Sequence, residues 1–228
     1  MLLRAENISK TFFRNTGSSN YFYAVSPMSI EVPPETVTVL TGRSGSGKTT
    51  LLNMLSGILP PTEGRVWLDS TDLYSMKDAA LSRFRNERIG VIPQARSAVD
   101  TLTVMENILL PARLYGKAAP VENAVLWMEK FDIAHLADAL PKELSGGELR
   151  RMAVVRAIAR DPDVLFADEP TGDLDNENTE IVLSALSSFA HRQKKAVFIV
   201  THENDALRYA DRLFRMDKGQ VTIQEKEQ

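Results

Sequence analysis

The stretch Gly42-Arg-Ser-Gly-Ser-Gly-Lys-Thr-Thr50 decides the fold, because it matches the phosphate-binding pattern G-x-x-x-x-G-K-[ST]. It follows a short β-branched run, Thr36 to Thr41, and leads into an apolar-periodic stretch, Lys48 to Leu59, that predicts a helix ending before Pro60. Glycines let the backbone N–H groups of such a loop curl around phosphate oxygens, and the helix start adds positive partial charge. A nucleotide-binding α/β core is therefore predicted.

The positions of this phosphate loop (Gly42–Thr50) have separate expected roles. Lys48 is expected to reach the β- and γ-phosphates, and the Thr49 hydroxyl is expected to bind Mg²⁺. The other positions are expected to hold phosphate through the loop backbone: Gly42, Arg43, Ser44, Gly45, Ser46, Gly47 and Thr50. The alternative is a Gly/Ser-rich turn with a chance lysine, which the flanking strand and helix disfavour.

A second motif, Val164-Leu-Phe-Ala-Asp168-Glu169, is a short apolar strand that ends in two carboxylates. Asp168 suits a Mg²⁺ contact, typically through water. Glu169 would face the space beyond the γ-phosphate, where a carboxylate can polarise an attacking water. Alternatively, Asp168 caps the turn before Pro170. The presence of the phosphate loop in the same chain favours the catalytic interpretation.

The order of the remaining patterns predicts a mostly parallel sheet with a helical insertion. Strands are predicted at 1–8, 25–32, 36–41, 65–68, 88–92, 164–167 and 196–200, with a closing strand pair across 213–223 and a polar loop or hairpin tip at 14–23. Helices are predicted at 48–59, 77–86, 104–114, 121–131, 149–159 and 178–192. We expect one domain over residues 1–228, with a core of about 1–94 and 161–228 and a helical subdomain of about 95–160.

Composition limits the possible partners and compartments. The chain has 228 residues, a net charge of −3 and no cysteine, so a disulfide framework is excluded and nucleic acid is not an expected partner. No apolar run approaches the roughly 20 residues that cross a bilayer. The first ten residues lack the features of a signal peptide. A soluble, cytoplasmic protein is expected, with any membrane role exerted through a partner.

The motifs occur in the order found in the ATP-binding cassette (ABC) ATPases, which the chain resembles over nearly its whole length. Gln94 in VIPQ resembles the Q-loop glutamine, and His202 in VTH resembles the switch histidine. Leu144-Ser-Gly-Gly-Glu148 resembles the family signature, and Thr171-Gly-Asp-Leu-Asp175 resembles the D-loop. The phosphate loop alone marks the large class of P-loop NTPases, whereas the signature with its following helix marks this family. The resemblance implies a P-loop NTPase core with an N-terminal antiparallel β part and an inserted α-helical subdomain.

The resemblance also implies a mechanism with ATP and Mg²⁺ as cofactors. Two copies would pack head to tail, and each ATP would be held by the phosphate loop of one copy and the signature of the other. The second grip would use Ser145, Gly146, Gly147 and Glu148, because amides and a hydroxyl at a helix start bind anions. The implied catalytic residues are Lys48, Gln94, Glu169 and His202. The implied metal contacts are Thr49, Gln94 and Asp168, and Asp175 would act across the interface.

The resemblance also implies an adenine platform, and the chain departs from the family pattern at three positions. The base is expected to stack on Phe12, although Phe13, Tyr21 and Tyr23 are competitors and an aromatic here could belong to the core. The signature ends in Glu148 where glutamine is commoner, which adds negative charge near an anionic ligand. In addition, Pro93 precedes Gln94 and Glu203 follows His202, where other residues are usual.

Two segments narrow the branch of the family. Leu102 to Pro111 and Asp168 to Asp175 are similar to the lipoprotein-releasing, macrolide-efflux and cell-division branch, and so is the insertion before Val25. That likeness implies an ATPase subunit that lies on the inner face of the cell membrane through a transmembrane permease subunit. A soluble ABC ATPase in cofactor assembly is the alternative. A nucleic-acid or ribosome-acting ABC protein is disfavoured, since the chain shows neither two cassettes nor a basic excess.

Overall fold

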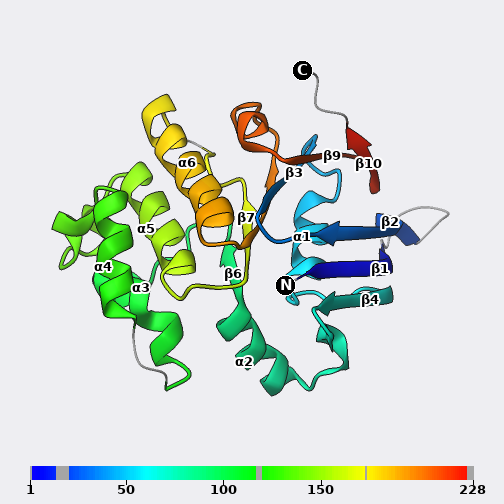
Figure 1. Ribbon diagram of the computed structural model, residues 1–228, viewed down its shortest axis with the longest axis horizontal. Coiled ribbons are helices and arrows are strands. Elements are labelled where there is room, and N and C mark those ends of the chain that lie inside the picture. The colour runs from blue at the N-terminus through cyan, green and yellow to red at the C-terminus, as the bar shows by residue number, and fades with distance from the viewer. Residues whose placement is uncertain (1, 14–20, 117–119, 173, 225–228) are drawn as a thin grey trace.

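The computed structural model describes residues 2–13, 21–116, 120–172 and 174–224. Its strands form two sheets, which lie on either side of helix α1 (Lys48–Leu55) (Figure 1). The antiparallel sheet has the order β2 (Tyr21–Val32), β1 (Leu3–Phe13), β4 (Glu63–Leu68) and β5 (Thr71–Asp72). The second sheet has the order β10 (Gln220–Gln224), β9 (Arg212–Asp217), β3 (Thr36–Gly42), β8 (Ala196–Thr201), β7 (Val164–Asp168) and β6 (Ile89–Ile92).

The helices gather mainly on the face of the second sheet that points away from α1 (Figure 1). They are α3 (Val104–Arg113), α4 (Val121–Lys130), α5 (Gly146–Ile158) and α6 (Asn176–Arg192), and α2 (Asp78–Arg88) precedes β6. Short 3₁₀ turns lie at Leu73–Ser75, Ala134–Leu136, Pro141–Glu143 and Asp205–Tyr209. The predicted fold class is confirmed: an α/β core, an antiparallel β part and a helical insertion. Among the described residues, none of the helices combines the length and apolar character that a membrane crossing requires.

The central strands are buried on both faces, as their continuous apolar sequences predict. In β7, Val164 and Phe166 pack toward α1, whereas Leu165 and Ala167 pack toward the outer helices. Every residue of β7 and of β8 is buried. Strands β3, β6, β7, β8 and β9 are parallel neighbours, so their carboxyl ends meet at one edge of the sheet.

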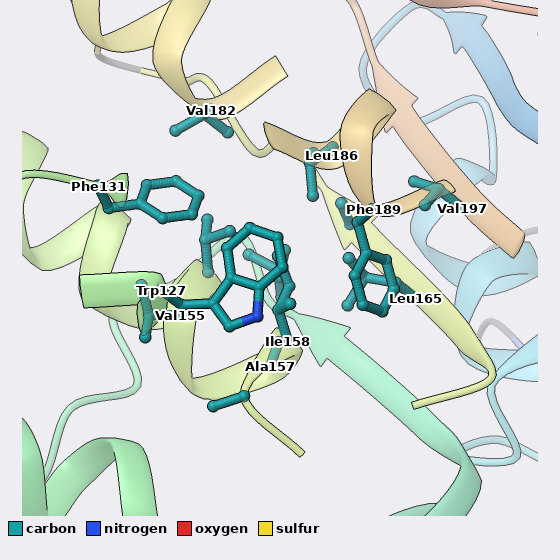
Figure 2. Close-up of a cluster of buried hydrophobic side chains, with 14 of the residues drawn as sticks. Trp127, Phe131, Val155, Ala157, Ile158, Leu165, Val182, Leu186, Phe189 and Val197 are labelled. Atoms are coloured by element: carbon teal, nitrogen blue, oxygen red, sulfur yellow. The ribbon is translucent and has the colours of Figure 1, made fainter. Parts of the chain in front are cut away.

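The outer helices close over this sheet through an aromatic cluster (Figure 2). The indole of Trp127 on α4 lies 6.2 Å, between ring centroids, from Phe131 and also from Phe189 on α6. All three side chains are buried, together with Ile158 of α5 and Leu165 of β7. The helical subdomain therefore shares one apolar core with the sheet that carries the predicted site.

Several predicted boundaries were wrong. Helix α1 ends at Leu55 instead of Leu59, because Gly57 adopts the left-handed region (φ 75°) and turns the chain. Strand β1 continues past Ile8 to Phe13, since it pairs with β2 along that length. Consequently residues 21–23 are strand and not loop, while the rest of the predicted hairpin tip, 14–20, lies outside the described residues.

Candidate active site

Three functional segments meet at the carboxyl edge of the parallel strands. The phosphate loop follows β3, Asp168 ends β7, and His202 follows β8. The register places Thr41 opposite Thr201 and Asp168 opposite Val200, so the ends of these strands lie level with one another. Ligands of parallel α/β sheets bind outside this edge. The topology thus brings together motifs that are more than a hundred residues apart in sequence.

Glycines shape the phosphate loop where it turns into α1. Gly45 (φ 77°) and Gly47 (φ 109°) both adopt positive φ, which side-chain-bearing residues rarely do. A Cβ atom on Gly47 would lie 2.1 Å from the carbonyl oxygen of Ala24 in β2. The loop therefore packs directly against the backbone of the antiparallel sheet.

The turn at Gly219 fastens the same loop from its other side. The Gly219 N–H donates to the carbonyl of Ser46 (2.9 Å), and the Gly219 carbonyl accepts from the Ser26 N–H of β2 (2.8 Å). The turn between β9 and β10 thus bonds the phosphate loop and β2 at once. The sequence predicts a turn at Lys218-Gly219 between the closing strands, but not these contacts, because they are made by backbone atoms.

Lys48 and Glu169 form the buried polar centre of the site. The Lys48 ammonium donates to the carbonyls of Gly42 (2.8 Å) and Arg43 (3.3 Å), and it lies 3.8 Å from Oε1 of Glu169. Both side chains are buried. A cation held among loop carbonyls at the start of a helix is suited to pair with phosphate.

Glu169 is held in a strained backbone conformation. Its φ of 47° lies in the left-handed region, which costs a residue other than glycine about 1–3 kcal/mol. The Oε2 atom accepts from the hydroxyl of Thr201 (3.1 Å) and the backbone N–H of His202 (3.3 Å), and it lies 2.9 Å from Nδ1 of His202. Thr201 was not predicted as a site residue, although its place just before His202 could have indicated it.

Asp168 is the group best suited to a metal-bound water. It is buried, and its Oδ1 atom has no hydrogen-bond partner among the described residues. Burial raises the pKa of the Asp168 carboxyl and the nearby Glu169 raises it further, whereas a hydrogen bond from Thr49 lowers it. An unpartnered buried carboxylate oxygen beside a threonine hydroxyl fits the oxygen ligands that Mg²⁺ takes.

A cavity of about 770 Å³ contains most of the predicted cofactor and catalytic residues. Its lining includes Phe12, Arg43, Ser44, Gly45, Ser46, Gly47, Lys48, Thr49, Thr50, Gln94, Glu169 and His202. Phe12 lies opposite Phe22 across β1 and β2, with 6.1 Å between ring centroids, and Phe22 and Tyr23 line the same cavity. Phe13 and Tyr21 do not line it. The volume and the mixture of polar and aromatic groups suit a nucleotide.

The signature residues do not line this cavity. Ser145 caps α5: its hydroxyl donates to Oε2 of Glu148 (2.7 Å), and the Ser145 backbone N–H donates to the same oxygen (2.7 Å). These two bonds lower the pKa of the Glu148 carboxyl, the hydroxyl bond contributing most. Two of the donors expected to bind an anion, the hydroxyl and the backbone N–H of Ser145, thus bond to the chain's own carboxylate.

Asp175 lies beside the signature and away from the cavity. It caps α6 by accepting from the Asn178 N–H (2.8 Å), and this bond lowers the pKa of its carboxyl. A Cβ atom on Gly147 would lie 3.4 Å from the Asn178 side chain. The structure therefore brings the signature and Asp175 together on one part of the surface. Asp173, in the predicted D-loop, lies outside the described residues.

The fold and this edge of the sheet define a P-loop nucleotide-binding domain. The sequence matches the ABC transporter family over residues 25–172, which is more than half of the chain. The chain belongs to the ABC transporter family and is an ATP-binding cassette of that family.

Relatives and solved structures agree with this membership. The chain is 36% identical over 216 residues to the lipoprotein-releasing system ATP-binding protein LolD of Leptospira interrogans, covering 94% of this chain and 90% of that one. It is 38% identical over 205 residues to an uncharacterized ABC transporter ATP-binding protein of Mycobacterium tuberculosis, of whose length it spans only 62%. A dimeric bacterial ABC transporter cassette superposes with a TM-score of 0.90, at 28% identity and 99% coverage of both chains. A post-hydrolysis cassette dimer bound to ADP and Pi superposes with the same score at 27% identity.

Proposed function

We propose that this chain hydrolyses ATP as one half of a head-to-tail dimer and thereby drives a transmembrane permease subunit. One observation carries the proposal: the cavity contains Lys48, Gln94, Glu169 and His202 but none of Ser145, Gly146, Gly147 or Glu148. Because the signature segment lies outside its own chain's cavity, it can complete the site of a second copy. The similarity to dimeric cassettes supports this arrangement.

Within the proposed site, each end of the cavity holds a different part of ATP. Phe12 stacks on the adenine, and the backbone N–H groups of the phosphate loop hold the phosphates, with Gly42 at the start of that loop. Lys48 leaves its loop carbonyls for the β- and γ-phosphate oxygens, where its charge is better compensated. The partner's signature then closes over the γ-phosphate, and Asp175 acts at the interface.

The residues fit a Mg²⁺ ion beside the phosphates. Thr49 would offer its hydroxyl, Asp168 its unpartnered oxygen through water, and Gln94 its amide oxygen. Such an ion, when bound, neutralises charge that develops on the transferred phosphoryl group.

Hydrolysis needs a water that attacks the γ-phosphorus in line with the leaving oxygen of ADP. Glu169 polarises this water and accepts its proton as the water oxygen bonds to phosphorus, while the bond from phosphorus to the β–γ bridging oxygen breaks and ADP leaves. His202, next to Glu169, holds the γ-phosphate and orients the water. Gln94, which lines the same cavity, positions the same water.

The names of the relatives support the proposed partner and location. Relatives named as lipoprotein-releasing ATP-binding proteins support a permease partner and a position on the inner face of the cell membrane. Residues 95–160 form the helical subdomain of a single unit whose core is about 1–94 and 161–228. A soluble ABC ATPase acting in cofactor assembly is the competing function, and recovery of the chain with membranes only when a permease is co-expressed would argue against it.

Glu169→Gln tests the catalytic proposal. The amide keeps the shape of the side chain but is a poor acceptor for the proton of water, so turnover should be lost while an ATP-dependent dimer accumulates. ATP hydrolysis and light scattering of the purified chain measure the two effects. Glu180→Gln, an exposed glutamate on α6, is the control and should hydrolyse ATP like the wild type. Normal turnover by Glu169→Gln would refute the assigned role.

A further inference from the structure

Arg150 joins the helical subdomain to the backbone of the catalytic segment. It lies in the second turn of α5, and its guanidinium donates to the carbonyls of Asp168 (2.9 Å), Glu169 and Pro170 (2.8 Å). The same group donates to the carbonyl of Pro93 (2.6 Å) and lies 3.5 Å from that of Gln94. One side chain thus binds carbonyls of two segments: 93–94, which follows β6, and 168–170, at the end of β7.

The segment 168–170 contains a strained backbone conformation that needs support. Glu169 has a positive φ, and its carbonyl and those of its two neighbours turn toward Arg150. A guanidinium has five N–H donors in a rigid fork and no acceptor, so it is suited to gather several carbonyl oxygens in a fixed arrangement. Without it, the three carbonyls would lose a charged donor and the left-handed turn at Glu169 would be less favoured.

The segment 93–94 carries Gln94, the other residue proposed to hold the attacking water. Its backbone reaches Arg150 through the carbonyls of Pro93 and Gln94. The positions of Glu169 and Gln94 relative to each other therefore depend on one arginine. We propose that Arg150 is a positioning residue for ATP hydrolysis, which fixes the backbone of Glu169 and Gln94 in the arrangement that acts on water. This inference rests on the proposed ATPase function.

The place of Arg150 on α5 adds a link to the second copy. Ser145 caps the start of the same helix, five residues earlier, which is about 7.5 Å along its axis. The helix whose first residues are proposed to grip the partner's ATP thus also holds the hydrolytic backbone of its own site. A shift of α5 on dimer closure would be passed to Glu169 and Gln94 through Arg150.

A second arginine on α5 provides a matched control. Arg156 donates to the carbonyl of Ser97 (2.7 Å) and to the Ser97 hydroxyl, so it also ties α5 to the segment after Gln94. Among the described residues, the Arg156 guanidinium donates to Ser97 and not to the carbonyls of 168–170. Arg156→Met removes a comparable tether from the same helix but leaves the catalytic backbone untouched.

The experiment compares Arg150→Met, Arg150→Lys and Arg156→Met in the full chain. Arg150→Met should lower kcat by about tenfold to a hundredfold, because small misplacements of catalytic groups have effects of that size. The Kd for a fluorescent ATP analogue should change by less than about threefold. Arg150→Lys should recover part of the rate, since one ammonium reaches the carbonyls of one segment but cannot bridge both. Arg156→Met should keep kcat within about threefold of the wild type.

Amide hydrogen exchange gives a readout that does not depend on activity. Arg150→Met should speed exchange in both 90–95 and 168–172, whereas Arg156→Met should affect only the segment around Ser97. Wild-type kcat in Arg150→Met, or equal losses of kcat in Arg150→Met and Arg156→Met, would overturn the inference. If Arg150→Met does not fold, Arg150→Lys carries the same test through its exchange pattern.

Glu169→Gln in the same assays separates this inference from the proposed function. Loss of hydrolysis in Glu169→Gln beside an unchanged rate in Arg150→Met would refute only the role of Arg150. Unchanged hydrolysis in Glu169→Gln would refute the role of Glu169, and a wild-type chain that does not hydrolyse ATP would refute the proposed function. In that case, faster amide exchange in only one of the segments 90–95 and 168–172 of Arg150→Met would refute the positioning role as well.

Discussion

Nδ1 of His202 lies 2.9 Å from Oε2 of Glu169, and the two side chains differ sharply in exposure. Glu169 is buried, whereas the imidazole is 64% exposed. The hydrogen bond to Glu169 raises the pKa of His202 above its usual 6.5, and the negative charge of Glu169 raises it further. A solvent-facing imidazole is therefore coupled to a shielded carboxylate.

The first prediction concerns pH. Because the pKa of His202 is raised in the folded chain, its contribution to stability is complete below about pH 6.5 and is lost as the pH rises through the raised value. NMR titration of the imidazole should give a midpoint above 6.5, and Glu169→Gln should lower it. Glu203→Gln should lower it less, since Glu203 acts only through its charge. A His202 midpoint that is unchanged in Glu169→Gln would contradict the coupling of these two side chains.

The second prediction distinguishes the aromatic residues of β1. Phe12 lines the cavity and its neighbour Phe13 points to the other face of the strand. Phe12→Ala should weaken ATP binding by about 1–3 kcal/mol, the size of a lost stacking contact, and Phe13→Ala should not. Calorimetric titration with ATP measures both. A larger loss of ATP affinity in Phe13→Ala than in Phe12→Ala would assign the adenine to the opposite face of β1.

The third prediction compares two glycines of the phosphate loop. Gly47→Ala places a Cβ 2.1 Å from the Ala24 carbonyl at a φ of 109°, so both strain and a clash arise. Gly45→Ala meets nothing within 4 Å and bears only the cost of its positive φ, about 1–2 kcal/mol. Urea unfolding should therefore show a larger loss of unfolding free energy for Gly47→Ala than for Gly45→Ala. Equal losses would mean that the loop can move away from β2.

The fourth prediction concerns the carboxylate that occupies the signature. Glu148→Gln removes a negative charge while keeping a side chain that can still cap α5, so the unfolding free energy should fall by only about 0.3–1 kcal/mol. ATP-dependent dimerisation, measured by light scattering in the Glu169→Gln background, should then need less ATP. Glu143→Gln is the control, because Glu143 is an exposed carboxylate that accepts from the Leu140 N–H one turn earlier. Identical ATP requirements for Glu148→Gln and the parent would show that the charge does not oppose the ligand.

The sequence predicted the parts of the site that side chains mark. The phosphate loop, Asp168, Glu169 and His202 each follow an apolar run, and short buried strands are easily recognised from such runs. Their meeting at one sheet edge then follows from parallel pairing. The signature was expected to serve the site of a second copy, and Ser145 does not line the cavity of its own chain.

Contacts made by backbone atoms could not be predicted. Arg150 resembles any polar residue of an amphipathic helix, and only the fold reveals that carbonyls of Pro93 and Pro170 surround it. The end of α1 was missed for a related reason, since the apolar residues continue past Leu55 while Gly57 turns the backbone. Sequence patterns report which side chains prefer burial, and they say little about where main-chain oxygens converge.

The turn at Gly219 connects the two sides of the nucleotide cavity. The Ser26 N–H of β2 and the Ser46 carbonyl of the phosphate loop are both bonded to this one residue. The spacing between the ring of Phe12 and the loop is therefore set by main-chain bonds, which side-chain changes in the cavity leave intact. A ligand must match that length to engage both ends, so a nucleoside without phosphates should contact one end alone. The hairpin of β9 and β10 thus ties the phosphate loop to the sheet that carries Phe12.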